Sequence, residues 1–156
     1  MPINTAKDMR VTLYKNNQDI ITKLMDFFSQ QRDVGFAYLF GSTARNKTRP
    51  LSDIDIAVYL REANSEIDLF RERLNFLYRL SVLLGTEKID LILLNNSPIE
   101  LTYRILKSGR LVSENDPRLK AAFYEKTIRD YLDFSPILRY RNRIIRQKML
   151  EGDYFD

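Results

Sequence analysis

The chain has 156 residues, the size of one ordinary domain with a real core. It contains no cysteine and no histidine, which excludes disulfides, thiolate or imidazole metal sites, and Cys–His or Ser–His catalysis. Any chemistry must therefore use carboxylates, hydroxyls, Lys and Arg, or a bound metal. The net charge of +4 fits a phosphate-bearing ligand, RNA or an acidic protein, and selects none of them.

Nothing in the sequence indicates a membrane segment. No apolar run approaches the roughly 18 residues that span a bilayer, and residues 1–10 lack the apolar centre of a signal peptide. We therefore expect a cytoplasmic protein with no membrane partner. In the absence of repeats or linkers, we expect a single domain over 1–156, with its core over about 16–112 and a C-terminal helical region over about 116–151.

The first half of the chain predicts one helix and two strands. Residues 16–31 carry an apolar stripe at helical spacing. Residues 34–40 form a short apolar run that ends at Gly41-Ser42, and residues 53–60 alternate as a half-buried strand does. The link between the two strands is short for a parallel crossover, which leaves their relative direction open.

A second helix and a third strand follow. Ser65, with an acid three residues later, resembles the start of a capping box, and Gly85 is a natural stop. One side of this helix carries apolar residues, namely Ile67, Phe70, Leu74, Leu77 and Tyr78. The strand over 88–94 is almost wholly apolar apart from Asp90.

The remainder of the chain reads as helical. Ser97-Pro98-Ile99-Glu100 predicts a second capping box, with proline at the first helical position, and Ser108-Gly109 should end that helix. Asp116-Pro117 opens a last helical region, which Ser135-Pro136 should break or kink. A final basic helix should then run to about Glu151. The whole order predicts an α/β (α+β) fold, a small mixed sheet flanked by helices with a C-terminal helical tail.

Two aspartates in the second strand are candidate metal ligands. Asp53 and Asp55 lie two residues apart, so an extended strand presents both carboxylates on one face. Two anions this close repel, and a hard divalent cation with oxygen ligands resolves the repulsion. The tripeptide is common, however, and two solvated aspartates on an edge strand are the alternative interpretation.

Asp90 is a third candidate ligand. It interrupts an otherwise apolar strand, where an ionised carboxylate needs a partner. If this strand neighbours the one with Asp53 and Asp55, the three acids form a metal cluster. The alternatives are that Asp90 lies at an exposed strand end, or pairs with a nearby Lys or Arg such as Lys88.

The Gly41-Ser42 pair is a candidate phosphate-binding turn. Glycine allows a close approach of the backbone to a ligand, and serine can cap a short helix whose N–H groups bind phosphate. Arg45 lies one helical turn later, where it either reaches phosphate oxygens or is a surface arginine. Gly-Ser after a strand is usually a simple turn, but its position twelve residues before Asp53 makes it more specific.

Together these residues resemble a known family. The pattern Gly41-Ser42-x10-Asp53-x-Asp55 resembles the signature of the DNA-polymerase-beta-like nucleotidyltransferases, and within them the MntA-like minimal antitoxins of HEPN/MNT toxin–antitoxin pairs. The resemblance covers essentially the whole chain, including Thr43-Ala44-Arg45, the strand with Asp90, and the stretches 106–111 and 127–132. Asn46 departs from the pattern, because a glycine often follows the arginine.

The resemblance implies an activity and a partner. Asp53, Asp55 and Asp90 would bind Mg²⁺, with two ions expected, and Asp90 would also orient or deprotonate the acceptor hydroxyl. Gly41, Ser42 and Arg45 would bind the nucleotide. The chain would form a hetero-oligomer with a cognate HEPN ribonuclease and would transfer AMP from ATP to a tyrosine hydroxyl of it, which blocks the toxin.

Other functions stay open at this point. The chain could instead act as an antitoxin by contact alone, or as a nucleotidyltransferase for a small molecule of the aminoglycoside type, although no second substrate domain is apparent. An RNA-end nucleotidyltransferase lacks support from a stacking platform. For the basic C-terminal segment, we expect docking or core packing rather than RNA binding.

Overall fold

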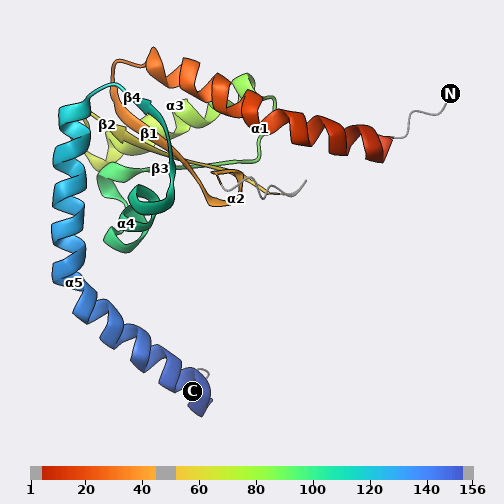
Figure 1. The fold of residues 1–156 in the computed structure, drawn as a ribbon. Helices are drawn as coiled ribbons and strands as arrows, with labels where there is room; N and C mark the ends of the chain where they lie inside the picture. Colours follow the sequence, from red (N-terminus) through yellow and green to blue (C-terminus); the bar gives the residue numbers. More distant parts are fainter. Residues whose placement is uncertain (1–4, 45–51, 153–156) are drawn as a thin grey trace.

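The structure is a computed structural model that describes residues 5–44 and 52–152 (Figure 1). A four-stranded sheet lies at its centre, with helices on both faces. In chain order the elements are α1 (Thr5–Ser29), β1 (Val34–Phe40), α2 (Gly41–Ala44), β2 (Ile54–Leu60), α3 (Glu66–Leu84), β3 (Ile89–Leu93), the 3₁₀ helix η1 (Leu94–Asn96), α4 (Ile99–Ser108), β4 (Arg110–Glu114) and α5 (Pro117–Glu151).

The sheet is mixed, as predicted. Its strand order is β3-β2-β1-β4. β1 runs antiparallel to both β2 and β4, whereas β2 and β3 are parallel and joined by α3. This settles the direction that the sequence left open, because the short link between β1 and β2 allows an antiparallel pair. The sequence prediction missed β4, which completes the sheet beside β1.

The two faces of the sheet have separate cores. Figure 1 shows α1 and α3 over one face, while α4 lies on the other and α5 descends beside it. Fully buried Phe28, Leu39 and Leu80 belong to the first core. The second core contains Phe36, Ala57 and Ile105, and α5 contributes the partly buried Phe123 to it. Alternate residues of β2 therefore serve different cores, which places Asp55 on the α4 face with Ala57.

Helix α3 begins and ends where the sequence predicted. The Ser65 hydroxyl accepts a hydrogen bond from the backbone N–H of Asp68 at 3.1 Å, and Gly85 ends the helix in the left-handed conformation with φ of 65°. The side of α3 that the sequence grouped as apolar, however, faces largely outward. Leu69, Phe76 and Leu80 are buried, whereas most of the side chains that the sequence grouped together are exposed.

The second predicted capping box is wrong. Helix α4 starts one residue later than expected, with Pro98 at the cap position and no side-chain cap. The Ser97 hydroxyl pairs instead with the hydroxyl of Thr102, and Thr102 also donates to the Pro98 carbonyl at 3.0 Å. The buried Thr102 thus pairs with the Ser97 hydroxyl, which the capping-box pattern had assigned to the start of the helix.

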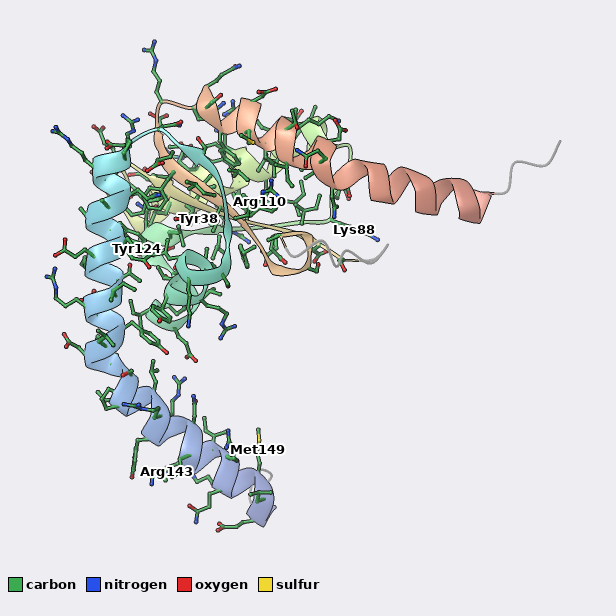
Figure 2. The ribbon with its side chains drawn as sticks, viewed as in Figure 1. Tyr38, Lys88, Arg110, Tyr124, Arg143 and Met149 are labelled. Atoms are coloured by element: carbon green, nitrogen blue, oxygen red, sulfur yellow. The ribbon has the colours of Figure 1, made fainter. Side chains whose placement is uncertain are left out.

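Helix α5 is continuous but bent. The bend lies about halfway along the helix (Figure 1), and Pro136 lies inside it, so Ser135-Pro136 kinks the helix without breaking it. Proline cannot donate to the carbonyl of Leu132. The Ser135 hydroxyl donates to that oxygen at 3.2 Å instead. The distal part, which carries Arg143 and Met149, extends away from the sheet (Figure 2).

The described helices include none that is long and apolar enough to cross a membrane.

Candidate active site

The central feature of the site is the register between β2 and β3. These parallel neighbours pair Asp55 directly with Asp90, so the two carboxylates extend from adjacent strands about 4.8 Å apart. Asp53 immediately precedes β2 and is exposed. The prediction that the strand with Asp90 neighbours the strand with Asp53 and Asp55 is therefore confirmed.

Gly41 brings the end of β1 against the Asp55 carboxylate. β1 pairs Phe40 with Asp55, and Gly41 follows with φ of 70° as the first residue of α2. A Cβ atom at position 41 would lie 2.0 Å from Asp55 Oδ2. Both the positive φ and this contact exclude a side chain. The glycine of the predicted phosphate-binding turn thus has a physical role, because it allows the turn and the carboxylate to meet.

Two neighbouring acids act electrostatically on Asp55. Partial burial raises the pKa of Asp55 above its ordinary value, and the negative charges of Asp90 and then Asp53 raise this pKa further. The site therefore contains a carboxylate whose ionised form is opposed by burial and by two neighbouring anions. Three oxygen-donor side chains in this state fit a hard divalent cation such as Mg²⁺.

Asp90 has a cationic neighbour, as one of the alternative interpretations of the sequence held, although the neighbour is Arg73 rather than Lys88. Its Oδ1 lies 3.7 Å from Nη2 of Arg73 on α3, and the Asp90 side chain is about half exposed. Arg73 also donates from Nε to the Leu91 carbonyl at 2.6 Å. Within the described residues, no three acidic side chains form a closed ligand group in this conformation. Metal binding by Asp53, Asp55 and Asp90 stays a prediction.

A hollow lies beside Gly41 on the α4 face. Its volume is about 210 Å³. The residues that line it are Phe40, Gly41, Leu101, Arg104, Ile105 and Ser108. Arg104 is exposed on α4 and adds a cation next to the glycine turn. Sequence reasoning missed Arg104, because its distance from Gly41 along the chain gave no signal that α4 would pack beside the turn.

The other predicted nucleotide-binding residues are only partly placed. Ser42 follows Gly41 in α2 and is half-buried. Arg45 and Asn46 lie outside the described residues. The structure thus brings Gly41 to Asp55 and leaves the roles of Ser42 and Arg45 untested.

Comparison with known proteins identifies the class. The family model described as polymerase beta nucleotidyltransferase matches residues 22–118, more than half of the chain. The chain therefore belongs to the polymerase-beta-type nucleotidyltransferase family, as its sequence pattern predicted. No curated protein matches it.

Several solved structures narrow the resemblance to toxin–antitoxin proteins. A toxin–antitoxin crystal structure with AMP-PNP is 26% identical, with a TM-score of 0.61, and the match covers 86% of this chain and 98% of that one. The toxin–antitoxin MntA–HepT is 25% identical, with a TM-score of 0.55 and coverage of 86% and 97%. The predicted resemblance to the MntA-like group is thereby confirmed.

A third solved structure shares the fold. It is a tri-AMPylated HEPN toxin from Shewanella oneidensis in complex with MNT antitoxin, with 24% identity, a TM-score of 0.56, and coverage of 87% of this chain and 98% of that one.

The contact between Gly41 and Asp55 can be tested with a matched pair of variants. Gly41→Ala and Gly85→Ala both place a Cβ at a positive φ, but position 85 has no heavy atom within 4 Å of the added carbon. Gly41→Ala should lower Mg²⁺-dependent AMP-PNP affinity about 10- to 100-fold, because it displaces a carboxylate from the site. Gly85→Ala should leave the affinity unchanged in titration calorimetry. Equal losses in both variants would contradict this account of Gly41.

The raised pKa of Asp55 predicts a pH-dependent gain in stability for Asp55→Asn. The folded pKa exceeds the unfolded one, so the ionised carboxylate opposes folding at neutral pH, and the penalty disappears as the pH falls below the ordinary value of 3.8. In metal-free buffer, Asp55→Asn should therefore raise the urea midpoint at pH 7, with the gain shrinking toward pH 3.5. The exposed Asp26→Asn is the control, and a lower midpoint for Asp55→Asn at pH 7 would refute the prediction.

Proposed function

We propose that this chain is a Mg²⁺-dependent adenylyltransferase that transfers AMP from ATP to a tyrosine hydroxyl of a cognate HEPN ribonuclease toxin and so neutralises it. The observation that carries the proposal is the pairing of Asp55 with Asp90 beside Gly41. Family membership adds the reaction class. One similar solved toxin–antitoxin structure contains the ATP analogue AMP-PNP, which supports an adenine nucleotide as substrate.

Each part of the site has a role in this reaction. Gly41 and Ser42 would hold the triphosphate through backbone N–H groups, with Arg104 next to it in the hollow of the α4 face. Asp53, Asp55 and Asp90 would hold Mg²⁺, which when bound neutralises phosphate charge and lowers the pKa of the acceptor hydroxyl. Asp90 would orient that hydroxyl from the edge of the sheet.

The proposed reaction is a single displacement at the α-phosphorus of ATP. The tyrosine oxygen forms a bond to the α-phosphorus, the bond from that phosphorus to the bridging oxygen breaks, and pyrophosphate leaves. The hydroxyl proton passes to Asp90 or to solvent. Because the site contributes mainly positioning and charge neutralisation, the absence of histidine is no obstacle.

The biological context is also part of the proposal. The antitoxin with this fold in the Shewanella oneidensis complex is bound to a tri-AMPylated HEPN toxin, which is the kind of product that such a transfer gives. We place this chain with a cognate HEPN partner in the cytoplasm, as one domain that forms a hetero-oligomer with the toxin.

Label transfer tests the reaction directly. With α-labelled ATP, Mg²⁺ and the purified partner, the wild-type chain should label the partner, and mass spectrometry should locate AMP on tyrosine. Asp53→Ala/Asp55→Ala should reduce the rate about a thousandfold or more, because metal stabilisation contributes several kcal/mol and each 1.4 kcal/mol is tenfold. EDTA should have a similar effect.

The control variant is Asp26→Ala/Asp33→Ala, which removes two exposed aspartates outside the site. It should transfer label like the wild type. If neither the wild type nor the active-site variant transfers label, yet both silence the partner, the chain is an antitoxin by contact alone.

A further inference from the structure

Helix α3 has a second apolar face that the fold leaves exposed. Five large side chains along it form what we call the α3 stripe, and their exposed fractions lie between 48% and 71%. The α3 stripe consists of Ile67, Phe70, Leu74, Tyr78 and Val82. Their spacing of three and four residues places them on one side of the helix, over a length of about 22 Å.

Among the residues that the structure describes, none packs closely enough over this stripe to bury it. The opposite side of α3, with Leu69, Phe76 and Leu80, already faces the core. The distal half of α5 also carries exposed apolar side chains, and it lies at the far end of the molecule from α3 in Figure 1. A contiguous exposed apolar surface of this kind marks an interaction site.

The α3 stripe is continuous with the candidate active site. A cavity of about 320 Å³ lies between α3, β3 and the start of α4. Phe70 belongs to both the stripe and this cavity, and Arg73 lines the cavity while contacting Asp90. Leu101 lines this cavity and also the hollow beside Gly41. The surface therefore leads from the exposed stripe to the third carboxylate.

In the described part of the chain, no further strand covers the edge of the sheet on this side. β3 is the outermost strand, and Arg73 satisfies the Leu91 carbonyl at 2.6 Å. An arginine that satisfies an edge carbonyl also discourages another strand from pairing there. A macromolecule can thus approach Asp90 across this edge by contact with side chains of α3.

We propose that the α3 stripe and the adjoining cavity form the docking surface for the protein that carries the acceptor hydroxyl, and that this docking directs the hydroxyl to Asp90 past the β3 edge. The inference rests on the proposed adenylyl transfer for the identity of that protein. A second copy of this chain on the same surface would cover the edge that the acceptor has to cross.

The charges around the stripe indicate the kind of partner surface. Acidic and basic residues are balanced along α3, with Glu66, Asp68 and Glu72 against Arg71, Arg73 and Arg79. The surface therefore suits an apolar protein face, such as one side of a helix, better than a polyanion. The distal part of α5 differs, because its charges are mostly basic.

Two matched double variants test the proposal. Phe70→Glu/Leu74→Glu places charges on the α3 stripe, and Ile137→Glu/Tyr140→Glu places them at similarly exposed apolar positions on α5. The α3 variant should weaken partner binding about 30-fold or more in titration calorimetry, as expected for central interface residues. It should lose label transfer, yet keep wild-type AMP-PNP affinity and thermal midpoint. The conservative Phe70→Leu/Leu74→Met should bind the partner like the wild type.

The outcomes separate this inference from the proposed function. If the wild type transfers no label but the α3 variant still loses partner binding, the reaction fails and the docking surface stands. If the α3 variant binds and labels the partner normally while the α5 variant does neither, the docking surface is wrong. A change from dimer to monomer in the α3 variant, with partner binding intact, would show that the stripe binds a second copy and would also overturn the proposal.

Discussion

The candidate site is built around the Asp55 carboxylate, whose ionised form is disfavoured by burial and by two neighbouring acids. Parallel pairing of β2 with β3 places Asp55 beside Asp90, and Asp53 lies two residues before Asp55. Burial and these two charges raise the pKa of Asp55. Adjacent carboxylates at strand ends do not favour stability by themselves, and we propose that they are there to bind a cation. Arg73 reduces the charge at Asp90 from the outer side of β3.

The rest of the fold keeps these groups in register. The antiparallel turn from β1 to β2 brings Gly41 against Asp55, and the crossover through α3 makes β3 parallel to β2. α3 thereby contributes in two ways. Its inner face packs the core, and its outer face carries the apolar stripe beside the route to Asp90. The same helix can therefore connect partner binding with acceptor placement.

Local signals predicted much of this fold from the sequence. The apolar run before Gly41 gave the bounds of β1, and Ser65 and Gly85 gave those of α3. These local signals did not predict elements whose structure depends on contacts between residues distant in the sequence. β4 is short and charged at both ends, with only Val112 and Ser113 buried, so its strand character comes from pairing with β1.

The residues of the candidate site also divide into those that local sequence signals indicate and those that only the packing of the fold brings in. The motif identified Gly41, Ser42 and the three acids, because their spacing along the chain is itself the signal. Arg73 and Arg104 reach the site only through the packing of α3 and α4 on the sheet. Likewise, the apolar residues of α3 showed a stripe in the sequence, but only the structure shows that this stripe faces outward.

The most direct test of the central claim is the position of a metal in the site. Crystals of the chain with Mn²⁺ and AMP-PNP should show anomalous peaks coordinated by Asp53 and Asp55, at least one also by Asp90, with the triphosphate against Gly41 and Ser42. Mn²⁺ bound elsewhere, or a nucleotide bound away from Gly41 while the three carboxylates hold no ion, would contradict the account.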